Sequence, residues 1–145
     1  MAWMSAYPPT RAGFLRRLAA MAYDTLVLFA LFMLAGFCTL ILTSGEAVTA
    51  GNPWFRALLL LFALSYFCGS WLRGGQTIGM KAWRLRVVRM DGSPLDARSA
   101  ALRFVTAALS WAIFALGFLW ILIDPQGRAW HDRLSGTRLV RIPKA

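Results

Sequence analysis

Residues 14–43 read FLRRLAAMAYDTLVLFALFMLAGFCTLILT, and the part from Thr25 to Thr43 carries no formal charge. Two further charge-free runs follow, Ala57 to Leu72 and Phe104 to Ile123. A helix of about 20 apolar residues is long enough to cross a hydrocarbon layer about 30 Å thick. The sequence therefore predicts an all-α integral membrane protein, a helical bundle.

We expect one membrane domain, residues 1–145, with apolar segments at about 18–43, 54–72 and 104–123. The first two segments are predicted to be transmembrane helices. The third either spans the membrane or is re-entrant. A loop, 73–103, and a tail, 124–145, hold most of the remaining polar residues.

Asp24 lies just inside the first apolar run, seven residues after Arg17. At about 100° per residue the two side chains share one helix face, about 10 Å apart along the axis. A carboxylate near the middle of a spanning helix costs about 2.5 to 3.5 kcal/mol, so it normally faces protein or a watery cavity. Asp24 is therefore either an ion or proton site or a structural acid paired with an arginine such as Arg103 or Arg73.

The charge distribution predicts an orientation. There are 16 lysines and arginines against 6 acids, a net charge of +10, and the bases concentrate before the first run and in the loop 73–103. Bases beside apolar runs follow the positive-inside rule, which argues against nucleic acid as a partner. We expect a multi-pass protein of a bacterial-type inner (plasma) membrane, with a cytoplasmic amino terminus and with anionic lipid head groups as partners.

No pattern typical of an enzyme is found. Cys38 and Cys68 lie inside apolar runs and are predicted to pack as small apolar side chains. There is no metal-ligand cluster, no nucleophile with a spaced base and no cofactor motif, so we expect no metal, no cofactor and no catalysis.

Two short basic segments have a strand pattern. In residues 83–88, WRLRVV, apolar and basic side chains mostly alternate, and residues 137–142, TRLVRI, have a similar pattern. They predict a small basic cytoplasmic β element. A straight third span would place the tail outside and separate two strands that are weak alone, whereas a bend near Leu116-Gly117 would return the tail to the cytoplasm. Both topologies stay open.

Two polar motifs carry further expectations. Residues 74–81, GGQTIGMK, indicate a turn in which Thr77 and Gly79 allow two backbones to approach closely. In the tail, His131, the single histidine, precedes Asp132. Histidine titrates near neutral pH, so a proton relay through His131 is one interpretation. Asp132 is expected to be a capping or salt-bridging acid at the cytoplasmic surface.

Four features together resemble the RDD family of small membrane proteins: GFLRRLAAMAYD at 13–24, QTIGMKAWRLRVVRMDGSPL at 76–95, Arg103, and WHDRLSGTRLV at 130–140. That family is named for one arginine and two aspartates, which the resemblance places at Arg17, Asp24 and Asp132. It implies a role in transport of unspecified ligands, and some members look like sodium/proton antiporters.

Two functions follow as hypotheses. The first is ion-coupled transport, the exchange of monovalent cations and protons at Asp24, supported by Arg103, Arg73 or His131. Three apolar segments are too few to enclose an ion pathway, so this hypothesis requires a homo-oligomer. The second is a non-transporting adaptor or structural subunit that binds anionic lipids or a partner membrane protein.

Overall fold

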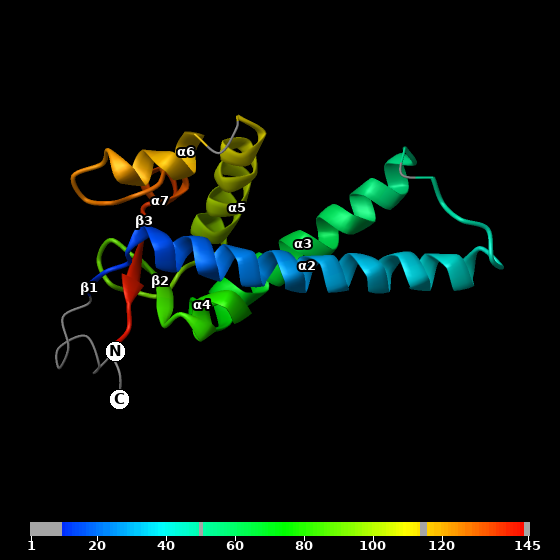
Figure 1. Cartoon of the computed structure of the whole chain (residues 1–145), viewed down its shortest axis with the longest axis horizontal. Coiled ribbons are helices and arrows are strands. Elements are labelled where there is room, and N and C mark those ends of the chain that lie inside the picture. The colour runs from blue at the N-terminus through cyan, green and yellow to red at the C-terminus, as the bar shows by residue number, and fades with distance from the viewer. Residues whose placement is uncertain (1–9, 50, 114–115, 144–145) are drawn as a thin grey trace.

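Two long helices dominate the computed structural model, which describes residues 10–49, 51–113 and 116–143 (Figure 1). They are α2 (Phe14–Leu42) and α3 (Pro53–Gly74), and both are long and apolar enough to cross a membrane. Few of their side chains are buried, as expected for helices that face lipid. The ends predicted for the first two apolar segments agree with these helices to within a few residues.

The sequence marks both ends of α3. The side chain of Asn52 accepts a hydrogen bond from the backbone N–H of Trp54 at 3.1 Å, and Pro53 occupies the first helical position. At the other end Gly75, with φ of 68°, adopts the left-handed conformation that ends many helices.

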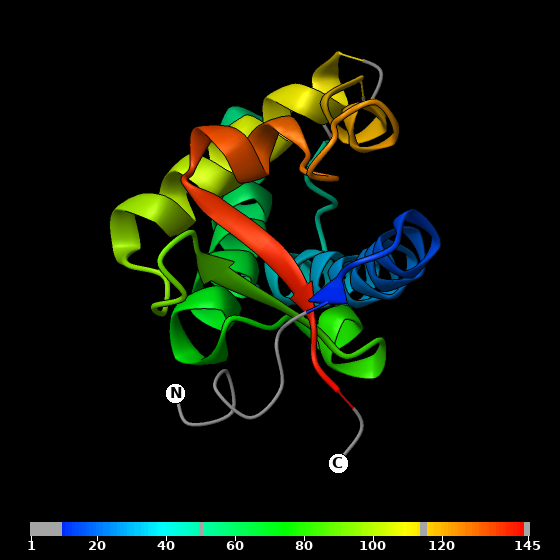
Figure 2. The same ribbon diagram turned by 90° about the vertical axis from the view of Figure 1, so that its left-hand side faces the viewer.

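A three-stranded sheet joins the amino-terminal stretch, the loop and the tail. Its strands are β1 (Thr10–Arg11), β2 (Leu85–Arg89) and β3 (Thr137–Arg141), antiparallel in the order β1-β3-β2. Figure 2 shows β3 between the other two. The predicted strands are confirmed, and because β2 pairs with β3, the tail returns to the loop.

The third apolar segment is not a straight helix. Helix α5 (Ala97–Ala112) begins seven residues before the predicted start, because Asp96 caps it by accepting a hydrogen bond from the Ser99 N–H at 3.0 Å. Beyond it lie the short helix α6 (Leu116–Leu119) and the 3-10 turn η1 (Trp120–Leu122), bent by 106° from α5. A bent segment is the alternative that agrees with the return of the tail.

Two short helices complete the strand-bearing end, α4 (Ile78–Ala82) and α7 (Trp130–Leu134). The turn predicted around Thr77 and Gly79 is thus the start of a helix, with Thr77 as its N-cap. Its predicted close backbone approach is confirmed, because a Cβ at Gly79 would lie 2.1 Å from the carbonyl oxygen of Ala20 in α2. The core lies where α2, α3 and α5 meet the sheet, and includes Ala20, Trp71, Leu85, Val87, Ala100 and Leu139.

Candidate functional site

Asp132 is the centre of a buried ion cluster. Its carboxylate accepts hydrogen bonds from Arg17 Nη1 at 2.7 Å and from Arg103 Nη1. Asp132 is 0 % exposed, Arg103 2 % and Arg17 5 %. The expectation of a salt-bridging acid is right, but the expected surface position is wrong: the packing of α2, α5 and α7 covers it.

Further contacts fix the geometry of this cluster. The carboxylate also accepts from the backbone N–H of Ala129 at 3.1 Å and so caps α7. Arg17 donates to the carbonyl of Gly127 at 2.9 Å, and Arg103 donates to the hydroxyl of Thr137 at 2.9 Å. The cluster therefore ties α2 and α5 to the tail, including β3.

The surrounding charges hold Asp132 ionised. Burial by itself raises the pKa of this carboxyl. Arg103, the charge of His131 when it is protonated, and the charge and hydrogen bond of Arg17 together hold the pKa well below its usual range. The buried carboxylate therefore stays charged throughout the physiological pH range.

His131 behaves differently from the sequence expectation. The pKa of its imidazole is lowered from 6.5 to about 4, mainly by burial. The charge of Asp132 raises this pKa, and the charges of Arg103 and Arg17 lower it. The Nε2 atom lies 3.7 Å from Asp132 Oδ1. The expectation that His131 titrates near neutral pH is therefore wrong, because a buried imidazole beside two cations stays neutral.

This lowered pKa predicts acid sensitivity. Between pH 6.5 and about 4 the unfolded chain binds a proton at His131 and the folded chain does not, so the free energy of unfolding falls as the pH falls. The shift corresponds to a loss of about 3 kcal/mol across that window. We expect the thermal unfolding midpoint in detergent to fall over this range, and the fall to be much smaller in His131→Gln.

His131 is the single histidine of the chain. The carboxyls with lowered pKa, including Asp132, stabilise the fold above their unfolded pKa near 3.8 and lose that contribution only below it. An equal slope in wild type and in His131→Gln would therefore contradict the assignment.

Asp24 forms a second, separate cluster. Its carboxylate accepts hydrogen bonds from Thr77 Oγ1 at 2.6 Å, Tyr66 Oη at 2.7 Å and the backbone N–H of Gly79 at 2.9 Å. The Tyr66 oxygen in turn accepts from the backbone N–H of Ile78 at 3.2 Å. Asp24 thus joins α2 to α3 and α4, and it is 4 % exposed.

The partners of Asp24 differ from those expected. A structural acid was predicted to pair with Arg103 or Arg73, yet Arg103 binds Asp132. Within residues 10–49, 51–113 and 116–143, the partners found for the Asp24 carboxylate are the three neutral donors. Arg17 and Asp24 are both buried on α2, as the shared helix face predicted, but they belong to different clusters.

A cavity of about 410 Å³ lies between the two clusters. Arg17, Asp24, Arg103 and His131 line its polar part, and most of its remaining wall is apolar. Arg73 lies elsewhere, at a second pocket beside α3 and α4. Among the described residues, no group of three or more His, Cys, Asp or Glu side chains could hold a metal ion.

Sequence reasoning missed the two hydroxyls that bind Asp24. Tyr66 is the one tyrosine of the charge-free run 57–72, and Thr77 was interpreted only as part of a turn. A polar aromatic residue in a spanning segment is the signal that could have identified Tyr66, since a buried hydroxyl needs a partner.

Comparisons with known proteins identify a family that covers most of the chain. The RDD family matches residues 11–136, a range that includes Arg17, Asp24, Arg103 and Asp132. The chain is 28% identical over 82 residues to the uncharacterized protein RP437 of Rickettsia prowazekii (strain Madrid E). That similarity covers 57% of this chain and 46% of the relative, so the chain spans less than half of the relative's length.

No solved structure matches this chain. The match of the family to most of the sequence, together with two helices long and apolar enough to span a bilayer, indicates a membrane protein. This chain belongs to the RDD family.

Proposed function

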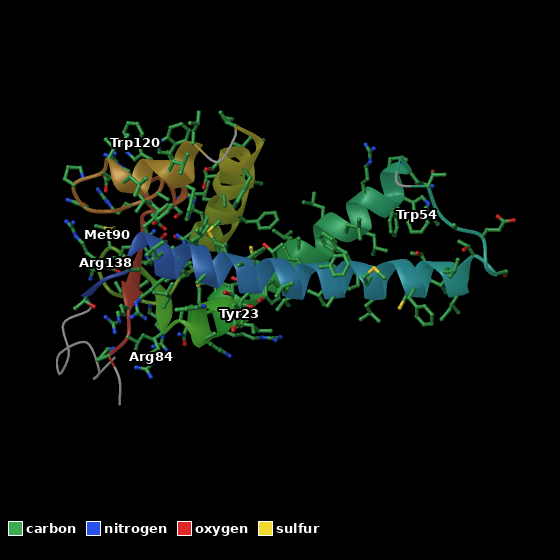
Figure 3. The ribbon with its side chains drawn as sticks, in the orientation of Figure 1. Tyr23, Trp54, Arg84, Met90, Trp120 and Arg138 are labelled. Carbon is green, nitrogen blue, oxygen red and sulfur yellow. The ribbon has the colours of Figure 1, made fainter. Side chains whose placement is uncertain are left out.

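We propose that this RDD protein lies in a bacterial-type inner membrane, with the strand-bearing end in the cytoplasm. The sheet supports a position of the amino-terminal stretch, the loop and the tail on the same side of the membrane, because β1, β2 and β3 come from these three segments and form one sheet. Figure 3 shows Arg84 and Arg138 at that end and Trp54 far from it. This arrangement fits the positive-inside rule and an aromatic residue at the opposite interface.

We propose that the protein exchanges monovalent cations and protons, with Asp24 as the carboxylate that binds them in turn. The observation that carries this proposal is the contrast between the two buried acids. Asp132 holds both arginines, whereas the partners described for Asp24 are neutral. A buried carboxylate without a protein cation is balanced when it binds a proton or a small cation.

The donors around Asp24 suit this exchange. The oxygen atoms of Tyr66 and Thr77 lie 2.7 and 2.6 Å from the carboxylate oxygens. Their hydroxyl hydrogens stabilise the free carboxylate, and the same oxygens have lone pairs for a cation once the hydrogens rotate away. Hard cations prefer oxygen ligands of this kind. The cavity beside Asp24 offers the space from which an ion approaches.

A single copy has too few spanning segments to enclose a pathway. We therefore propose that the transporting unit is a homo-oligomer. The many exposed apolar side chains of α2 and α3 leave room for contacts between copies as well as with lipid.

Asp24→Asn is expected to abolish cation-driven proton flux, because the amide cannot carry the charge that binds a cation or gives up a proton. The measurement is sodium- and potassium-driven proton flux in liposomes at matched incorporation. Glu46→Gln, an equal charge change at an exposed acid, is the control and should keep wild-type flux. Equal flux in the Asp24→Asn protein would contradict the role of Asp24.

A non-transporting adaptor is the second candidate, favoured by the way the Arg17–Asp132–Arg103 cluster clamps α2 and α5 to the basic sheet. Absence of flux from folded wild type across several cations and pH values would reject the exchanger. A stoichiometric partner membrane protein that co-purifies would then support the adaptor.

A further inference from the structure

We infer that the pocket beside the end of α3 is a binding site for the phosphate group of an anionic lipid. The pocket has a volume of about 500 Å³ and is lined by residues of α3, α4 and their connection. This inference does not depend on ion exchange at Asp24, because the groups assigned to the phosphate are not ligands of Asp24 and the test measures binding rather than flux.

The chemistry of the lining favours an anion. Arg73 and Lys81 supply two positive charges, and the lining includes no carboxylate. Ser65 and Ser70 add hydroxyl donors. Among the described residues, no acid lies within ion-pair distance of Arg73 or Lys81. Two cations and two hydroxyls around one pocket match the acceptor oxygens of a phosphate group.

The helix geometry places these groups on one face. Ser65, Gly69 and Arg73 follow each other at intervals of four residues on α3, so they lie one above another over the last turns of the helix. Gly69 leaves the pocket open, since a Cβ at this position would meet no atom within 4 Å.

The other polar groups of the pocket are already occupied. Gln76 donates to the carbonyl of Leu85 at 2.7 Å, and Tyr66 donates to Asp24 at 2.7 Å. They shape the wall, and the two cations and two serines remain for the ligand.

The position of the pocket favours a lipid over a free anion. It lies at the carboxyl end of α3, a helix apolar enough to span a membrane, where this helix meets the strand-bearing end of the molecule. Lysines and arginines at this level attract the head groups of anionic lipids. A phosphate held here has its diester substituents beside the apolar surface of α3, which the acyl chains can cover.

The test measures lipid binding to the purified full-length protein by native mass spectrometry in detergent. The probes are phosphatidylglycerol, phosphatidylcholine with the same chains, and inorganic phosphate as a competitor. We expect phosphatidylglycerol to bind at least about tenfold more tightly than phosphatidylcholine, since each nearby base adds to the attraction. Inorganic phosphate in excess should weaken this preference.

Two pairs of variants locate the site. Arg73→Gln with Lys81→Gln should remove the preference, whereas Arg98→Gln with Arg141→Gln, an equal charge change at exposed bases outside the pocket, should keep it. Gly69→Leu should fill the pocket and remove binding, whereas Gly69→Ala should keep it.

Four outcomes would overturn the inference. They are equal binding of the two lipids, an equal loss in the two charge variants, unchanged binding in Gly69→Leu, or tight binding of inorganic phosphate without any preference among lipids. The last outcome would assign the pocket to a free anion. None of these measurements depends on proton flux, so a failure here is distinct from a failure of the exchanger.

Discussion

Asp132→Asn is expected to destabilise the protein by about 3 to 5 kcal/mol, because it removes one partner of a buried ion cluster. Arg17 and Arg103 would both stay buried without a counter-charge. The asparagine amide nitrogen is a donor and would face arginine donors on one side. The thermal unfolding midpoint of the purified protein in detergent, and the yield of folded protein, would both fall sharply.

The control for Asp132→Asn is Glu46→Gln, which removes a negative charge at an exposed position and should change the midpoint little. The coupling within the cluster can also be measured. Arg17→Gln combined with Asp132→Asn should cost less than the sum of the two single changes, because the two residues are in direct contact. Strict additivity, or a wild-type midpoint for Asp132→Asn, would show that the cluster does not hold the tail.

Gly79→Ala is expected to destabilise the protein by about 3 kcal/mol, through overpacking that side-chain movement cannot relieve. The new Cβ would lie 2.1 Å from the backbone oxygen of Ala20 and 2.9 Å from the Asp24 carboxylate. Helix α4 would have to move away from α2, and Asp24 would lose the Gly79 N–H donor. We expect a lower thermal unfolding midpoint together with loss of any flux that depends on Asp24.

Gly36→Ala is the matched control for Gly79→Ala. Gly36 lies inside α2, and a Cβ there meets no atom within 4 Å. Alanine is a better helix former than glycine by about 1 kcal/mol, so this change should be neutral or stabilising. If both variants unfolded at the same temperature, the close approach of α4 to α2 would not be a feature of the folded protein.

The two clusters assign different tasks to two aspartates that look alike in sequence. Asp132 has its charge balanced by arginines and organises the fold. The partners described for Asp24 are neutral hydroxyl and amide donors, and its carboxylate borders a cavity. Asp132 therefore links distant segments through charged partners, whereas Asp24 links α2 to α3 and α4 through neutral ones, and the exchange proposed above rests on this contrast.

Much of the secondary structure was predictable. Hydropathy placed α2 and α3, because the length of an apolar run is a property of neighbouring residues. The alternation of apolar and basic side chains placed β2 and β3, because it too is a property of neighbouring residues. The early start of α5 was missed, since it depends on the cap at Asp96 within a stretch that hydropathy does not mark.

The candidate site was only partly predictable. Helix periodicity placed Arg17 and Asp24 on one buried face, and the family signature singled out Asp132. Periodicity could not show that Arg17 would turn toward Asp132, which lies 115 residues away in sequence. The surface position assigned to Asp132 and the near-neutral titration assigned to His131 were wrong because both depend on burial by distant segments.

The sequence by itself determined that this chain forms two long apolar helices and short basic strands. It also determined that Asp24, inside an apolar run, needs a polar or charged partner. These properties depend on local hydropathy, charge and periodicity. Only the tertiary structure decided which partner each acid has. For Asp132 that choice depends on the return of the tail to β2, which brings Asp132 to Arg17 and Arg103. For Asp24 it depends on the packing of α3 and α4 against α2, which brings Tyr66, Thr77 and Gly79 to its carboxylate.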